Sequence, residues 1–357
     1  MTIIYCRQEV SFLTYDYDYG YGDLENKLIR LFRSGAPDFA AAEDLIRQGA
    51  DINAVGKDDD ENILSEILSG YWWSEHGDII SDACDNCDEN HCDNCEHNRN
   101  LNPNLGASMC AIIRFFLAHG FDVNKCDGCF GAQCLWALTL STFDRYMIEA
   151  TKLLLDAGAK NRTVSPTSTD QDETPWDYIA VKASFPSDWD NDYSTTNIFE
   201  AVYQVYQAVA DGRSYSGIDS YEMAIGKKII KILAESDGAN PTFFAMDLPE
   251  FKRDNCYNAT LYFVYDGGVL ISTQYADFWT DTILPATDLI DVSEHFDGVV
   301  GNTIKGFTYD HRSIVEGTTH YGQPITTIEM DSGRKVRFSI NFGEVREQDR
   351  AAFYELI

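Results

Sequence analysis

The residues best suited to chemistry in this chain are a cluster of cysteines. Eight of the ten cysteines lie between Cys84 and Cys134, and four of them form two Cys-x2-Cys pairs, Cys84 with Cys87 and Cys92 with Cys95. Zinc takes four thiolate or imidazole ligands in a tetrahedron, and paired cysteines are a common way for a loop to supply them. The spacing predicts a structural zinc ion bound by Cys84, Cys87, Cys92 and Cys95.

Two features of this cluster leave the ligand set open. Only four residues separate the two pairs, so His91 or His97 is an alternative to one of the cysteines. The surrounding segment is also rich in Asp and Glu. Carboxylates raise the pKa of nearby thiols, although they also attract a divalent cation. The alternative interpretation is a set of free thiols in an acidic loop.

A second set of cysteines repeats the spacing without a fourth member. Cys126, Cys129 and Cys134 predict a candidate second metal site, which Cys110 completes only by folding back from a helix. Cys110 lies among apolar residues and Cys134 lies at a helix start. Since a free cysteine behaves as a small apolar side chain, packing in the core is the alternative for both.

The charge of the chain restricts its partners. The 357 residues include 58 acidic and 27 basic side chains, which leave a net charge of −31. The part before Gly238 carries −22 of this charge and the part after it carries −9. A field of this sign repels phosphate backbones and anionic lipids and attracts basic proteins. We therefore expect a basic protein partner, and we expect binding neither to nucleic acid nor to a membrane.

The ends and the apolar stretches of the chain bear on its compartment. No stretch approaches the roughly 18 consecutive apolar residues that a membrane span requires, and the segment Met1–Val10 lacks the basic start and apolar core of a secretory signal. We expect a cytoplasmic protein. In that compartment clustered cysteines favour metal binding over a disulfide framework.

A recurring segment organises the first two-thirds of the chain. Residues 45–53, Leu-Ile-Arg-Gln-Gly-Ala-Asp-Ile-Asn, are echoed by residues 116–124 and, in part, by residues 154–161. Glycine directly after a helix takes the left-handed conformation that ends it, and Asp-x-Asn is suited to a turn. The pattern predicts three amphipathic helices that each end in glycine and a tight turn. Further helices are expected at 24–32, 40–46, 63–68, 134–140, 174–178 and 198–210.

This organisation resembles a degenerate array of ankyrin repeats over residues 22–235. The resemblance is carried by the three turns and by Thr174-Pro175-Trp176, where threonine caps a helix and proline is its first residue. Ankyrin repeats recur at about 33 residues, whereas 71 residues separate Gly49 from Gly120. The difference predicts an insertion over residues 74–107, which contains the cysteine cluster. A smaller insertion is expected at 185–196.

The resemblance implies an α-solenoid that binds another protein through the tips of its turns and its inner helices. The candidate contact residues are mostly acidic and are Asp58, Asp59, Asp60, Asp127, Phe130, Asp170 and Asp172. Their charge favours a basic partner. The alternative is that these carboxylates form a solvated face that serves solubility.

The pattern changes towards the end of the chain. Residues 221–235 are expected to form a helix that caps the stack, and from residue 241 onwards the apolar period becomes two. Hairpins are expected at 260–273 and 325–342, followed by a helix at 344–356. The predicted class is therefore α+β, with a helical domain over 1–238 and a small α+β domain over 239–357.

Catalytic motifs are missing from the sequence. It contains no phosphate-binding glycine loop, no Gly-x-Ser-x-Gly and no His-Glu-x-x-His. Glu294-His295 and Asp310-His311-Arg312 are the only suggestive neighbours. We expect a binding scaffold rather than an enzyme. The alternatives are an enzyme in the 239–357 domain whose substrate the array recruits, and an immunity-like or antitoxin-like protein that masks a basic toxin.

Overall fold

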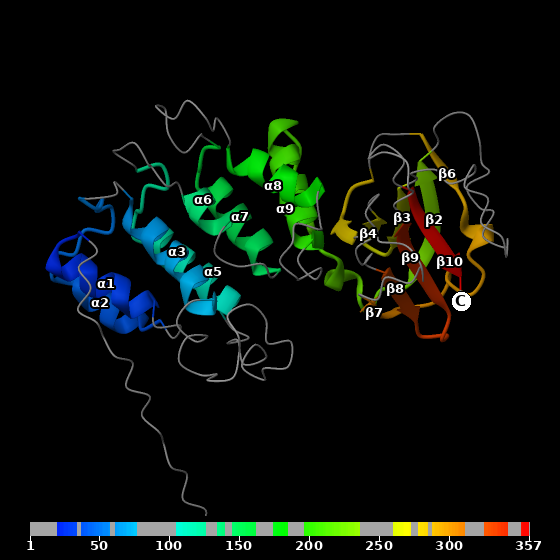
Figure 1. Ribbon diagram of the computed structural model, residues 1–357, viewed down its shortest axis with the longest axis horizontal. Helices are drawn as coiled ribbons and strands as arrows, with labels where there is room; N and C mark the ends of the chain where they lie inside the picture. The colour runs from blue at the N-terminus through cyan, green and yellow to red at the C-terminus, as the bar shows by residue number, and fades with distance from the viewer. Residues whose placement is uncertain are drawn as a thin grey trace, which may run out of the picture.

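A computed structural model describes most of the chain. The described chain divides into a helical part and a part made of sheets (Figure 1). The described residues are 20–33, 37–57, 61–76, 105–125, 134–139, 145–161, 174–184, 196–235, 260–272, 278–284, 288–310, 325–341 and 351–356. Within these ranges eight α-helices are followed by ten strands in two antiparallel sheets. The predicted α+β class is confirmed.

The helices form consecutive pairs that stack side by side. The pairs are α1 (Asp23–Arg33) with α2 (Phe39–Arg47), α3 (Ile63–His76) with α5 (Leu105–Ala118), α6 (Cys134–Thr139) with α7 (Tyr146–Asp156), and α8 (Pro175–Ser184) with α9 (Thr196–Ala210). The first members pack against one another in the order α1, α3, α6, α8, and α5, α7 and α9 do the same in a second row (Figure 1). The helices expected from the sequence over 24–210 are confirmed.

The second helix of every pair ends in the same way. Gly49, Gly120, Gly158 and Gly212 follow α2, α5, α7 and α9, and all four have a positive φ, between 67° and 107°. The residue after each glycine donates its N–H to a carbonyl five residues earlier, at 2.8–3.1 Å. This is the hydrogen-bond pattern of a Schellman motif, and it needs a residue that adopts the left-handed conformation without strain. The three glycine turns expected from the sequence are confirmed.

Two antiparallel sheets make up the rest of the described chain. The first has the order β1-β5-β4-β3-β2-β6 and the second the order β10-β9-β8-β7. The strands are β1 (Asp219–Ser220), β2 (Ile229–Glu235), β3 (Leu261–Tyr265), β4 (Gly268–Ser272), β5 (Phe278–Asp281), β6 (Leu289–Asp291), β7 (Ile304–Asp310), β8 (Ile325–Met330), β9 (Lys335–Asn341) and β10 (Ala351–Leu356). Both expected hairpins are confirmed, as β3–β4 and β8–β9.

The helix expected over 221–235 is wrong. A single 3-10 turn, Tyr221–Ala224, precedes strand β2 instead. Successive residues of β2 alternate between two cores: Ile232 and Ala234 are buried on one side of the sheet and Leu233 on the other. The apolar residues of this segment also have a spacing that suits a helix, but β2 pairs with β3 on one side and with β6 on the other. Its β-branched residues pack well in a strand that is covered on both faces.

The helix expected over 344–356 is also wrong in the part that the structure describes. Residues 351–356 form β10, which pairs with β9 in a regular antiparallel register from Ala351↔Asn341 to Leu356↔Val336. The physical reason is the open edge of β9, whose backbone groups need a partner. Two adjacent aromatic residues, Phe353 and Tyr354, favour a strand there.

Two apolar cores divide the molecule into three layers. One core joins the helices to one face of the first sheet and contains Val205 of α9 and Trp279 of β5. The second core lies between the two sheets, where Phe278 and Phe338 meet with ring centroids 4.6 Å apart. Strand β2 precedes the domain boundary expected at residue 238 yet pairs with strands that follow it. Residues 236–259 lie outside the described residues, so the boundary itself stays a prediction.

Candidate functional site

Most of the residues predicted to form sites lie outside the described residues. These are the zinc ligands Cys84, Cys87, Cys92 and Cys95, two members of the second cysteine set, Cys126 and Cys129, and all seven candidate contact residues, Asp58, Asp59, Asp60, Asp127, Phe130, Asp170 and Asp172. Within the described ranges no three Cys, His, Asp or Glu side chains gather where they could hold a metal ion. Both metal sites therefore remain predictions.

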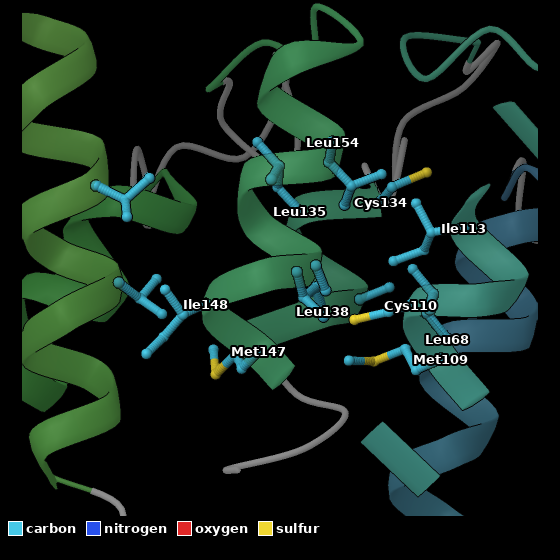
Figure 2. Packing of buried hydrophobic residues seen from close by; sticks show 14 of the residues in the cluster. Leu68, Met109, Cys110, Ile113, Cys134, Leu135, Leu138, Met147, Ile148 and Leu154 are labelled. Atoms are coloured by element: carbon cyan, nitrogen blue, oxygen red, sulfur yellow. The ribbon is translucent and has the colours of Figure 1, made fainter. Parts of the chain in front are cut away.

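The two cysteines that the structure describes are packed in the helical core. Cys134 at the start of α6 is fully buried, and its thiol lies 3.5 Å from Asn62 Oδ1 and 3.7 Å from Ser65 Oγ. Cys110 is 1% exposed and its thiol donates to the Tyr146 carbonyl at 3.4 Å. Figure 2 shows both sulfur atoms among leucine, isoleucine and methionine side chains. These surroundings match the alternative in which both thiols serve packing.

Asparagine side chains join the first glycine turn to the second and the second to the third. Asn53 donates from Nδ2 to the Gly120 carbonyl at 3.3 Å and accepts the Asp122 N–H on Oδ1 at 2.8 Å. Asn124 repeats this geometry one step further, with 2.9 Å to the Gly158 carbonyl and 3.0 Å from the Lys160 N–H. The 71 residues between Gly49 and Gly120 therefore correspond to one step of the stack, as the 38 residues between Gly120 and Gly158 do.

The aspartate two residues earlier holds each asparagine in place. Asp51 Oδ1 accepts the Asn53 N–H at 2.9 Å, and Asp122 Oδ1 accepts the Asn124 N–H at the same distance. A carboxylate that accepts the N–H two residues on forms an Asx turn, which fixes the backbone locally. The Asp-x-Asn pattern of the sequence therefore supplies both the turn and the bridge to its neighbour.

The third turn is linked to the next helix by a related contact. Asn161 donates from Nδ2 to Thr174 Oγ1 at 2.9 Å and accepts the Trp176 N–H on Oδ1 at 3.1 Å. Thr174 caps α8, since its hydroxyl accepts the Asp177 N–H at 3.2 Å while Asp177 Oδ2 accepts the Thr174 N–H at 2.8 Å. The threonine cap expected from the sequence is confirmed.

A second group of polar contacts lies where the helices meet the first sheet. Lys152 of α7 donates from Nζ to the Ser216 carbonyl at 3.4 Å, and Tyr215 donates its hydroxyl to Asp156 Oδ1 at 2.6 Å. These contacts tie α7 to the segment that leads from α9 into β1. We call Lys152, Asp156, Tyr215, Asp219 and Asp281 the junction cluster.

Burial shifts the pKa of three members of the junction cluster, Lys152, Tyr215 and Asp281. Desolvation lowers the pKa of Lys152, although the negative charges of Asp219 and Asp281 act in the opposite direction. Desolvation also raises the pKa of Tyr215 to about 12, with a further contribution from its hydrogen bond to Asp156. Asp281 is only 4% exposed, and burial raises its pKa in spite of the N–H groups of Thr282 and Ile283 that its carboxylate accepts.

Perturbed pKa values are a common mark of functional sites, but ion pairs that serve structure perturb them as well. In the junction cluster Lys152 and Asp156 of α7 face Tyr215, Asp219 and Asp281 of the following segment and sheet. The arrangement can hold a helix against a sheet, with one partly buried cation among several carboxylates. No local pattern of residues predicts this cluster, because its members come together only through the packing of distant elements.

Of the polar neighbours that stood out in the last third of the sequence, the structure describes the side chains of Glu294 and His295. His295 Nε2 lies 3.7 Å from Glu294 Oε1, but the Glu294 side chain is 85% exposed. Asp310 ends β7, and its neighbours His311 and Arg312 lie outside the described residues. An exposed pair of this kind contributes little interaction energy.

No family model, curated protein or solved structure matches this chain. Across the ranges that the structure describes, no helix is both long enough and apolar enough to cross a bilayer.

The buried carboxyl of the junction cluster leads to a prediction about stability. Burial raises the pKa of Asp281 in the folded state, so folding favours its protonated form. The stability that this proton contributes is present below the unfolded pKa of about 3.9 and is lost as the pH rises through the folded value. We expect Asp281→Asn to be at least as stable as the wild type at about pH 7, with an advantage that shrinks as the pH falls towards about 4.

Urea unfolding of both proteins across this pH range measures the effect. Asp266→Asn, at the exposed turn between β3 and β4, controls for the substitution itself. A marked loss of stability in Asp281→Asn at neutral pH would show that the ionised carboxylate is favoured by its neighbours and would contradict this description.

Proposed function

We propose that this chain is a protein-binding scaffold whose helical part is a degenerate array of ankyrin-like repeats. The array would cover most of residues 1–238, with insertions at 74–107 and 185–196, and a separate α+β domain would follow over 239–357. Support comes from four helix pairs in two rows, with the second helix of each pair ending at a glycine of positive φ.

The observation that carries the proposal is the repeated asparagine bridge. Asn53 and Asn124 occupy equivalent places in successive turns and make the same two hydrogen bonds to the next turn, at 2.8–3.3 Å. An asparagine that bonds the backbone C=O and N–H of the following unit can do so only when consecutive units are stacked with the same orientation. Such stacks form long surfaces to which every unit contributes a few side chains, and binding another protein is their usual use.

The end of the array needs a cover, because the last unit of a stack exposes an apolar face. In place of the expected capping helix, α9 packs against β1 and β5 of the first sheet. Ile218 is fully buried there and Trp279 is 9% exposed, within the same core as Val205 of α9. We infer that the first sheet serves as the cap of the array.

The charge of the chain supports a basic partner. The net charge is −31, and the part before Gly238 carries most of it. Acidic surfaces of this size speed the approach of a cationic protein and oppose that of an anionic one. The candidate contacts remain the acidic turn residues Asp58, Asp59, Asp60, Asp127, Phe130, Asp170 and Asp172, which lie outside the described residues.

We expect the affinity for a purified basic partner to fall roughly tenfold between low and high salt, since screening weakens attraction between exposed charges. Reversing three of the proposed contacts, in Asp58→Lys/Asp59→Lys/Asp60→Lys, should weaken binding by a similar factor. Titration calorimetry in a salt series measures both effects. Asp266→Lys, a charge reversal in the turn of the sheet, is the control and should leave the affinity unchanged. A salt-independent affinity that the triple variant retains would rule out this mode of binding.

We further propose that zinc stabilises the insertion over 74–107 through Cys84, Cys87, Cys92 and Cys95. A segment without apolar periodicity gains order from a metal ion that ties its ends together. Elemental analysis of the purified protein is expected to find one zinc per chain, lost in Cys84→Ser/Cys87→Ser. Cys110→Ser, which changes a buried thiol of the core, should retain the metal. Zinc-free wild-type protein would refute the proposal, and zinc retained by the double variant would refute this ligand set.

A further inference from the structure

Exposed apolar side chains gather in one short segment of the described chain. Among all the described residues, five large apolar side chains are more than 40% exposed, and three of these five lie within a span of eight residues. These three are Met223 at 48%, Ile225 at 46% and Ile230 at 55%. The segment leads into β2 and runs beside β7 (Figure 1). Exposed apolar side chains that cluster in this way often mark interaction surfaces, whereas single exposed apolar residues are common on any protein.

Two exposed lysines lie between these apolar residues. Lys227 and Lys228 make no ion pair with any residue that the structure describes. Carboxylates of the neighbouring elements already have partners: Glu222 lies 3.8 Å from Arg145, and Glu329 accepts from Lys305 at 2.9 Å. Among the residues that the structure describes, the two lysines therefore present positive charge that no ion pair neutralises. We call Met223, Ile225, Lys227, Lys228 and Ile230 the 223–230 strip.

The backbone of the strip is held in place by its neighbours. Gly226 donates its N–H to the Ile304 carbonyl at 2.8 Å, and Ile304 donates back to the Lys227 carbonyl at 2.9 Å. Ile230 lies at a β-bulge of β2, where the register with β3 shifts between Ile229 and Lys231. Bulges turn side chains out of the regular alternation. Because the backbone is already ordered, a ligand need not supply the free energy to fix it.

We propose that the 223–230 strip is a docking surface for an acidic segment of a partner protein that carries apolar side chains. Its carboxylates would pair with Lys227 and Lys228, and its apolar side chains would cover Met223, Ile225 and Ile230. This surface lies on the sheet part of the molecule. Its proposed partner is acidic, whereas the partner proposed for the array is basic. The two proposals can therefore be tested independently, and failure of one does not affect the other.

The charge of the whole chain distinguishes this occupant from other anions. Screening limits exposed charges to a range of about 8 Å at physiological salt. A short acidic segment thus interacts mainly with the two lysines. A nucleic acid or an anionic bilayer extends well beyond that range and meets the rest of a surface whose net charge is −31. The charge and the apolar side chains of the 223–230 strip therefore favour a short acidic segment with apolar side chains over a nucleic acid or a bilayer.

The test uses the full chain and short labelled peptides. One peptide alternates Glu and Leu, and a matched peptide alternates Glu and Ser. Fluorescence anisotropy should show saturable binding of the Glu/Leu peptide that weakens with salt, with affinity at least about tenfold lower for the Glu/Ser peptide. Vesicles of phosphatidylserine and phosphatidylcholine are the third probe, and we expect no binding to them.

Variants of the strip complete the test. Lys227→Glu/Lys228→Glu and Ile225→Ser/Ile230→Ser should each weaken binding of the Glu/Leu peptide by about tenfold or more. The control is Lys57→Glu/Lys160→Glu, which reverses two exposed lysines of the helical part and should leave binding unchanged. Circular dichroism and thermal unfolding check that each variant folds. Absence of binding, equal binding by the lysine variant and the wild type, or preference for vesicles would overturn the proposal.

Discussion

The helical part depends on how the backbone groups of its turns find hydrogen-bond partners. A helix that ends in a left-handed glycine leaves the carbonyl of that glycine and the N–H of the second residue after it without partners in their own helix. Here the asparagine of the preceding turn supplies both a donor and an acceptor: Asn53 binds the Gly120 carbonyl and the Asp122 N–H, and Asn124 does the same one step later. The turns at Gly120 and Gly158 are thereby completed by the turn that precedes each of them. A single helix pair removed from the stack would lose these bonds, so the units depend on one another.

The sheet part extends this dependence beyond the helices. One face of the first sheet shares a core with α9, and the junction cluster adds polar contacts from α7 to the segment before β1. The other face packs on the second sheet. Since burial of apolar area is the main stabilising contribution in such contacts, we regard the apolar core as the source of cohesion. The partly exposed charges of Lys152 and Asp156 serve chiefly to fix orientation.

The local features of the fold could be predicted from the sequence, whereas the features that depend on distant pairing could not. Gly49, Gly120 and Gly158 were recognisable because turn chemistry depends on a few adjacent residues. Gly212 has the same conformation but lacks the following Asp-x-Asn, so no pattern revealed it. The apolar residues of β2 suit either a helical or a strand period, so only its pairing with β3 decides for a strand. The junction cluster and the 223–230 strip depend on tertiary packing, which leaves no signal in local spacing.

Hydrogen exchange at individual amides tests the central claim most directly. The N–H groups of Asp122 and Lys160 donate to Asn53 and Asn124 and should exchange slowly in the wild type, although both residues lie in exposed turns. Asn53→Ala should release the Asp122 amide and leave Lys160 protected, and Asn124→Ala should do the reverse. If both amides of the wild type exchanged as fast as those of an unfolded chain, the turns would not be bridged and the account of a stacked array would be wrong.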